Sequence, residues 1–206
     1  GFHLVCLAES NVGYRNLCQL NAKAWLEGYY YKPRVDKELL AQHAEGLIAL
    51  TACLGGEVPA YILDGDDKRA QQALQDYLDI FGKGNLYVEL QDHGLEEQKR
   101  VNARLIEYSK TCQLPLVVTN DSHYLRREHA QAHDLFLCIG TQSTVDANDR
   151  FRFHGADFYF KSGDEMAALF PDYPETVSNT LAIAERCNVT PKTVDDGANH
   201  YPEFSV

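Results

Sequence analysis

"LVVTNDSHYL", residues 116–125, runs from a β-branched apolar stretch directly into an aspartate and a histidine. A short apolar run that ends in turn-forming residues such as Asn120 predicts a buried strand, here over residues 114–119. Asp121 and His123 follow this strand two positions apart, a spacing at which both side chains can turn to the same side. The stretch therefore predicts a strand end that carries two groups able to bind a metal ion.

The same strand pattern occurs three more times, and segments with helical spacing separate the four runs. Strands are predicted at residues 1–8, 46–52, 85–90 and 114–119. Helices are predicted at residues 12–27, 37–43, 57–63, 67–82, 95–112 and 127–141. Strands that alternate with helices at intervals of about 30–40 residues indicate βαβ units with parallel strands. The fold class that this pattern predicts is α/β, either doubly wound or a barrel.

The pattern changes after residue 150, where a short aromatic strand and two helices replace the βαβ alternation. The strand is predicted at residues 157–161 and the second helix at 174–186. Ser162 and Glu165 have the spacing of a capping box at the start of the first of these helices. We therefore divide the chain into residues 1–150, residues 151–190, and a polar tail or linker at 191–206.

Composition favours a folded protein and limits its partners. The 206 residues are 45% hydrophobic and 24% charged, which is typical of a globular chain with one sizeable core. The net charge of −11 works against nucleic-acid binding by the whole surface, because such binding rests on lysine and arginine neutralising phosphates. A local site that uses metal ions can still accept a phosphate, since the ions carry the positive charge. No apolar run approaches the roughly 20 residues of a membrane span, so we expect no membrane association.

Six cysteines occur at wide spacings, at Cys6, Cys18, Cys53, Cys112, Cys138 and Cys187. All except Cys53 and Cys112 stand beside apolar residues in predicted strands or helices. The chain contains no C-x-x-C pair and no secretory hydrophobic segment. We therefore expect free, buried thiols in a cytoplasmic protein.

Chemistry is expected at the ends of the strands, because ligands of parallel α/β folds gather at the carboxyl edge of the sheet. Cys53 follows the second strand and His93 follows the third, as Asp121 and His123 follow the fourth. A thiolate, carboxylates and imidazoles that converge on one edge would bind zinc or another transition metal. No residue is assigned a catalytic role from this pattern.

Each of these residues also has a plainer interpretation. Asp121 can start a turn with His123 on the surface, and Cys53 can be a small buried hydrophobic residue. His93 can be a loop residue near a helix start, and Glu57 can serve the N-terminus of the helix that it begins.

Two further histidines, His129 and His133, stand four residues apart on a predicted helix. Neighbouring alanines and the lack of a third ligand favour one packed and one solvated histidine over a metal pair. The sequence also has no glycine-rich phosphate loop and no G-x-S-x-G nucleophile elbow, which argues against a P-loop nucleotide site and a serine hydrolase.

Seven stretches of the chain together resemble one known family. They are HLVCLAESNVGYRNLCQLNAKAWLEGYYYKPRVDKELL (3–40), EGLIALTACLGGEVP (45–59), YVELQDHGLEEQKRVN (87–102), PLVVTNDSHYL (115–125), AHDLFLCIGTQSTVDANDRFRF (132–153), FYFKSGDEMAALFPDYPETVSNTLAIAERCNV (158–189) and YPEF (201–204). Over nearly the whole chain, they resemble the PHP (polymerase and histidinol phosphatase) domain of the bacterial replicative DNA polymerase III alpha subunit.

The resemblance implies a distorted (β/α) barrel of the PHP type with a helical C-terminal portion, of which this chain holds an incomplete part. It implies metal ligands at His3, Cys53, Asp121 and His123, with His93 and Glu57 as weaker candidates. His3 fits least well by position, because it precedes its strand instead of following it. The implied ions are zinc, manganese or magnesium, and they would serve a phosphoesterase or 3′-to-5′ exonuclease reaction.

The family's opening H-x-H segment and its polymerase palm are absent from this chain, so the resemblance implies a fragment that is inactive alone. The parent would be a DNA-directed DNA polymerase that replicates the chromosome, with DNA, a sliding clamp and a proofreading exonuclease subunit as partners. The alternatives are a non-catalytic scaffold that contacts the proofreading subunit and a free-standing PHP phosphatase. A barrel without its first strands exposes a sheet edge, so we also expect self-association or marginal stability.

Overall fold

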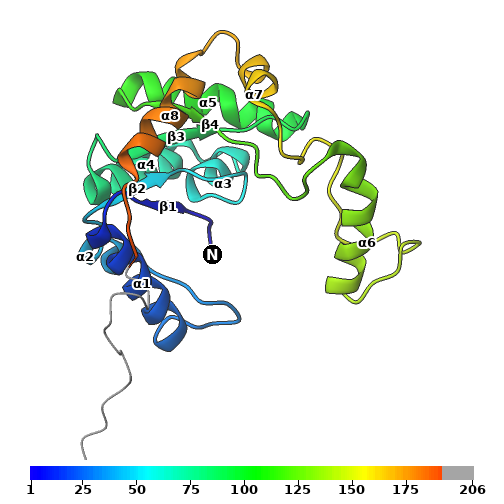
Figure 1. The fold of residues 1–206 in the computed structure, drawn as a ribbon, viewed down its shortest axis with the longest axis horizontal. Helices are drawn as coiled ribbons and strands as arrows, with labels where there is room; N and C mark the ends of the chain where they lie inside the picture. Colours follow the sequence, from blue (N-terminus) through cyan, green and yellow to red (C-terminus); the bar gives the residue numbers. More distant parts are fainter. Residues whose placement is uncertain (192–206) are drawn as a thin grey trace, which may run out of the picture.

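A four-stranded sheet forms the centre of the computed structural model, which describes residues 1–191 (Figure 1). The strands are β1 (Val5–Ala8), β2 (Leu47–Leu50), β3 (Leu86–Leu90) and β4 (Leu116–Val118), and they lie in this order across the sheet. β2, β3 and β4 are parallel, as the sequence pattern predicts. The structure thus confirms the α/β class, with a sheet that is open rather than closed into a barrel.

The first strand runs in the opposite direction to the other three. β1 pairs with β2 antiparallel, with Val5 opposite Leu50 and Ala8 opposite Leu47. The prediction of four parallel strands was therefore wrong for β1. The connection between β1 and β2 contains two helices and returns the chain to the end at which β1 stopped. There the N–H of Glu9 donates to the carbonyl of Gly46 at 2.8 Å.

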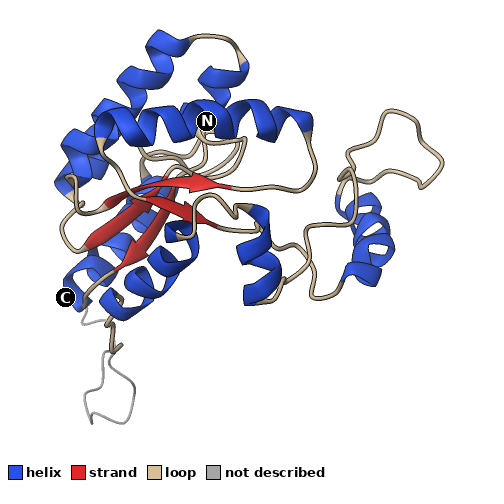
Figure 2. Cartoon of the chain, turned by 90° about the horizontal axis from the view of Figure 1, so that it is seen from above, coloured by secondary structure: helices blue, strands red, loops and turns tan. Residues whose placement is uncertain are grey.

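Helices cover both faces of the sheet (Figure 2). They are α1 (Asn11–Leu26), α2 (Lys37–Gln42), α3 (Glu57–Leu63), α4 (Asp67–Phe81), α5 (Glu96–Cys112), α6 (Ala130–Gly140), α7 (Gly163–Leu169) and α8 (Glu175–Arg186). α4 and α5 pack on one face, and α8 lies along β4 on the other. None of these described helices is long and apolar enough to cross a membrane.

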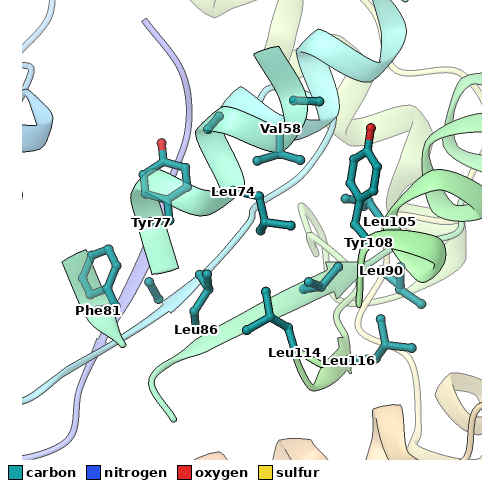
Figure 3. Close-up of a cluster of buried hydrophobic side chains, with 14 of the residues drawn as sticks. Val58, Leu74, Tyr77, Phe81, Leu86, Leu90, Leu105, Tyr108, Leu114 and Leu116 are labelled. Atoms are coloured by element: carbon teal, nitrogen blue, oxygen red, sulfur yellow. The ribbon is translucent and has the colours of Figure 1, made fainter. Parts of the chain in front are cut away.

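The core follows from the alternation of side chains along the buried strands. Leu47 and Ala49 point into a large cluster with α4 and α5, whereas Ile48 and Leu50 point to the opposite face. Figure 3 shows the large cluster, in which side chains from α3, α4 and α5 meet those of β3 and β4. The continuous apolar runs of β2 and β4 are therefore explained by burial on both faces.

Three predictions about the second half and the cysteines need correction. Residues 157–161 form no strand, because only Tyr159 makes a bridge, to Tyr124. The helix predicted at 127–141 begins as a 3₁₀ turn, η1 (Arg127–His129), before α6. All six cysteines are free, as expected, but only Cys138 is buried. Cys18 is exposed and lines an open cleft beside α1, and the other four are half-buried.

Other predictions from this part of the sequence hold. Ser162 and Glu165 form the predicted capping box at the start of α7, and α8 occupies the predicted second helix. The predicted tail at 191–206 lies outside the described residues, apart from residue 191.

α6 stands apart from the sheet on two connecting segments (Figure 1). An ion pair between Arg150 and Asp134 holds the chain that follows α6 against the helix. Leu135, Phe136 and Ile139 are exposed on α6, and Phe136 is 70% exposed. Within the described residues, this arm therefore presents an apolar face without a covering element.

We predict that the chain self-associates through β1, which pairs with a strand on one side only within the described residues. An unpaired strand edge is a template for pairing with a second chain, and charged residues on such an edge prevent it. Val5→Lys, at an exposed position of β1, should therefore shift the sedimentation profile toward the monomer. Val145→Lys, in the exposed loop after α6, is the matched control and should not. A parent chain that stays monomeric at all concentrations and unfolds cooperatively would contradict this expectation.

Candidate functional site

The antiparallel direction of β1 brings His3 to the carboxyl edge of the parallel strands. The start of β1 lies beside the end of β2, where the N–H of His3 donates to the carbonyl of Gly55 at 2.8 Å. The Nδ1 atom of His3 is 3.5 Å from the Sγ atom of Cys53. His3 therefore precedes its strand and still shares an edge with the residues that follow theirs.

A strained turn after β2 sets the position of Cys53. Ala52 has a φ of +66°, in the left-handed region that a residue with a Cβ rarely occupies. At Gly56, a Cβ would collide with the carbonyl oxygen of Thr51, so this position requires glycine. Strain of this kind persists only where surrounding contacts hold it, and it is concentrated at functional sites.

Glu89 supplies the contact that holds this turn, and the sequence analysis missed it. Its carboxylate is 4% exposed and accepts a hydrogen bond from the N–H of Ala52 at 2.8 Å. It also accepts from the hydroxyl of Thr119, after β4, and from the amide of Gln91 at 3.2 Å. Burial raises the pKa of Glu89. The available signal was a glutamate inside the otherwise apolar strand LYVEL.

Asp121 and His123 form a second pair at the same edge, after β4. The Nε2 atom of His123 is 3.5 Å from Oδ1 of Asp121, and both side chains are about one-third exposed, at 35% and 38%. Asp121 has a φ of +45°, again in the left-handed region. The backbone N–H of His123 donates to the carbonyl of Phe158 at 2.8 Å, and its ring packs against Phe153.

Asn120 anchors the loop that carries this second pair. Its side-chain amide donates to the carbonyls of Asp157 and Tyr159, at 3.1 and 2.5 Å. Lys161 donates to the amide oxygen of Asn120 at 2.9 Å. The loop after β4 is thereby fixed to the segment that sequence analysis took for a strand.

The spacing within each pair suits the binding of one ion. A tetrahedral zinc ion, with bonds of about 2.3 Å to sulfur and 2.0 Å to nitrogen, separates these donors by about 3.5 Å. His3 and Cys53 have this separation, and the oxygen and nitrogen of Asp121 and His123 are also 3.5 Å apart. Within residues 1–191, however, no three such side chains gather around one point. The edge therefore holds two pairs of donors and no complete set of ligands.

The two weaker candidates have their polar atoms engaged elsewhere. His93 is 3% exposed, and its Nε2 donates to the carbonyl of Asn120 while its Nδ1 accepts from the amide of Gln98, both at 2.7 Å. Burial lowers the pKa of His93, so the ring is neutral and has no free lone pair. Glu57 accepts from the hydroxyl of Tyr77 at 2.8 Å and pairs with Lys37 at 3.0 Å. In this structure the polar atoms of both residues are thus already paired with protein groups.

One histidine of the α6 segment packs against the second donor pair. His133 packs against the ring of His123, with centroids 5.6 Å apart, and against Phe153. Burial and the neighbouring His123 lower the pKa of His133. His133 is thus the packed member that the sequence analysis expected, and it supports His123.

The thiol of Cys53 is protonated at neutral pH. Burial raises its pKa, and the negative charges of Asp121 and Glu89 raise it further. Without a cation Cys53 is therefore a poor nucleophile, because the thiolate is the reactive form.

Comparisons with known proteins show which family and which proteins the sequence resembles. Residues 1–93 match the PHP domain family. The chain is 51% identical over 188 residues to the DNA polymerase III alpha subunit of Treponema pallidum, covering 91% of the chain and 16% of the relative. It is 43% identical over 208 residues to that of Thermus aquaticus, covering 100% and 17%. The alpha subunit of Borreliella burgdorferi is 43% identical over 187 residues. The chain thus spans about one-sixth of the length of these relatives.

We predict that replacing Glu89 destabilises the fold. In Glu89→Leu the buried N–H of Ala52 loses its acceptor while the volume stays similar, which should lower the free energy of unfolding by about 1–3 kcal/mol. Glu97→Leu, an exposed glutamate on α5, is the matched control with little expected change. Urea unfolding measures both, and equal stability of the two variants would refute the role of Glu89.

We predict that alkylation of Cys53 is slow at neutral pH, and that its rate keeps rising until the pH exceeds the ordinary pKa of a thiol. The rate is low at neutral pH because a raised pKa leaves less thiolate at a given pH. Asp121→Asn removes one of the negative charges that raise the pKa of Cys53 and should speed its alkylation a few-fold. Asp92→Asn is the control. Peptide mass spectrometry after iodoacetamide treatment measures the rates, and an unchanged rate in Asp121→Asn would contradict the coupling.

Proposed function

Since residues 1–93 belong to the PHP domain family and the chain is related along its length to DNA polymerase III alpha subunits, we propose that it forms part of a bacterial replicative DNA polymerase. The complete protein would be a DNA-directed DNA polymerase that works in the cytoplasm with DNA, a sliding clamp and a proofreading exonuclease subunit. The relatives' names support this proposal, because they are alpha subunits over 91–100% of this chain.

Within that protein, the edge around Cys53 and Asp121 supplies part of a metal-dependent phosphoesterase site. The observation that supports this proposal is the presence of two donor pairs, each with the 3.5 Å spacing that suits one ion, at the same sheet edge. Sulfur, nitrogen and carboxylate donors together favour zinc, while manganese and magnesium depend more on the carboxylate. Zinc, manganese or magnesium is the proposed cofactor.

The residues of this chain have distinct tasks at the proposed site. Bound metal ions would lower the pKa of a water molecule and offset the negative charge of a phosphodiester. Cys53 and His3 would hold one side of the cluster, and Asp121 with His123 the other. Glu89 keeps the Cys53 turn in place, and the packed ring of His133 limits the movement of His123. Because each pair offers an ion only two protein ligands, this chain by itself would bind metal weakly and would not hydrolyse phosphodiesters.

A non-catalytic scaffold is the second candidate function. It is favoured by the apolar face of α6, where Phe136 and Ile139 are 70% and 76% exposed. A surface of this kind in a polymerase subunit suits contact with another part of the protein or with a proofreading partner. A scaffold needs no strained turn at Cys53, however, so the phosphoesterase interpretation explains more of the edge. A free-standing PHP phosphatase is disfavoured by the relatives, which are alpha subunits.

We predict that the donor pairs give the chain a measurable affinity for zinc. Titration against a chromophoric zinc indicator should show binding that weakens by about tenfold or more in Cys53→Ser/His123→Ala. Cys18→Ser/His43→Ala removes the same two residue types away from the edge and serves as the matched control.

Equal zinc affinity of the parent and the Cys53→Ser/His123→Ala variant would overturn the metal site and leave the scaffold. Hydrolysis of bis-p-nitrophenyl phosphate by the parent with zinc or manganese, lost in the same variant, would contradict the claim that the donor set is incomplete.

A further inference from the structure

The segment between α1 and α2 exposes a group of aromatic rings that no part of the proposed site uses. Trp25 and Tyr29 are each 56% exposed, Tyr30 is 63% exposed and Tyr31 is 80% exposed. Figure 1 shows this part of the chain running out from the end of α1 as an open loop before it returns to α2. Large rings held in solvent are unfavourable by themselves, so their clustering indicates a surface that meets a partner.

The rings are held by a well-defined local structure. Trp25 stacks on Tyr29, with centroids 5.6 Å apart and planes 20° apart, and Tyr30 meets Tyr31 edge to face at 4.7 Å. A Cβ at Gly28 would collide with the carbonyl oxygen of Arg34, so the two ends of the loop touch. The N–H of Tyr30 donates to the carbonyl of Lys32 at 3.0 Å. The loop therefore presents its rings at low entropic cost.

The segment that carries the rings is weakly positive, whereas the whole chain is negative. Residues 25–35 contain Lys32 and Arg34 against one acidic residue, Glu27, although the chain has a net charge of −11. The guanidinium of Arg34 lies 5.0 Å from the centroid of the Tyr30 ring, in a cation–π contact. Exposed rings beside cations are the arrangement by which proteins stack on bases and neutralise phosphates.

We propose that this aromatic-basic platform, formed by Trp25, Tyr29, Tyr30, Tyr31, Lys32 and Arg34, binds single-stranded DNA. Unpaired bases offer their flat faces to the rings, while Lys32 and Arg34 contact the phosphates between them. A duplex keeps its base faces covered, so it would gain only the two phosphate contacts. The net negative charge of the chain works against nucleic-acid binding by the whole surface, but here the binding is confined to one loop that carries Lys32 and Arg34.

The platform adjoins the edge that carries the donor pairs. A Cβ at Gly1 would lie 3.7 Å from Nε of Arg34, and Gly1 is two residues from His3. Arg34 also lines an open cleft of about 840 Å³ whose other walls include Phe2, Leu4, Asp36 and Glu57, and whose lining does not include His3 or Cys53. Binding to the platform therefore needs no metal ion.

Trp25 is the chain's one tryptophan, so it reports on stacking directly. We expect its fluorescence to be quenched when oligo-dT of about 20 nucleotides is added at about 50 mM salt, with EDTA present to exclude metal binding. Anisotropy of a fluorescein-labelled oligonucleotide gives the dissociation constant. The same measurements with oligo-rU and with duplex DNA show whether the sugar and the strandedness matter.

Two variants separate the stacking from the charge. Tyr30→Ala/Tyr31→Ala should weaken binding by about tenfold or more, since each lost base–ring stack is worth at least about fivefold. Lys32→Gln/Arg34→Gln should make the slope of log affinity against log salt concentration shallower by about 1.4, which is about 0.7 for each lost phosphate contact. The controls are Phe151→Ala/Phe160→Ala and Lys68→Gln/Arg100→Gln, which change exposed aromatic and basic residues elsewhere in the chain.

The proposal is supported if single strands quench the fluorescence of Trp25 and if this quenching is lost in the platform variants but kept in the controls. Equal binding of oligo-rU and oligo-dT would also support it, and would show that stacking on the bases is the main interaction. The proposal would be overturned if neither quenching nor an anisotropy change occurred. It would also be overturned if the platform variants bound as well as the parent chain, or if the chain preferred duplex DNA. Binding of anionic vesicles in place of oligonucleotides would also overturn it, in favour of a membrane surface. Because EDTA is present, none of these results depends on the metal site.

Discussion

The buried carboxylate of Glu89 holds three strand ends together at one edge of the sheet. It lies on β3 and accepts hydrogen bonds from Ala52, after β2, and from Thr119, after β4. Ala52 is held in a left-handed conformation by this contact, and Cys53 follows it directly. Burying an acid is unfavourable unless its oxygens are hydrogen-bonded, and here both oxygens are. The placement of the candidate ligands after β2 and β4 therefore depends on one polar residue inside an apolar strand.

Sequence patterns predict most of the elements and part of this edge. Strand ends indicated Cys53, Asp121 and His123, because apolar runs that stop at polar residues are visible in one dimension. The direction of β1 was not visible, since the apolar pattern does not show at which end of the sheet the chain returns after the two helices, and so the place of His3 could not be derived. The engaged ring of His93 was hidden for a related reason, because Gln98 and Asn120 approach it only in the folded chain.

The proposed functions fall on separate surfaces of the structure. The carboxyl edge carries the two donor pairs proposed to bind a metal ion, the loop after α1 carries exposed rings and cations, and α6 carries an apolar face away from the sheet. Each surface uses residues that contribute little to the core, as the exposure of Tyr31 and Phe136 shows. The rigid sheet beneath them explains how a chain that spans about one-sixth of its relatives' length can position several contacts at once.

An anomalous difference map from crystals grown with zinc would show whether the sheet edge binds a metal ion. We predict a zinc peak at this edge within bonding distance of Sγ of Cys53 or of the Asp121 carboxylate, with water completing its coordination. A map with no peak at this edge, or with zinc only at exposed histidines such as His154, would contradict the proposal that the edge holds a metal ion.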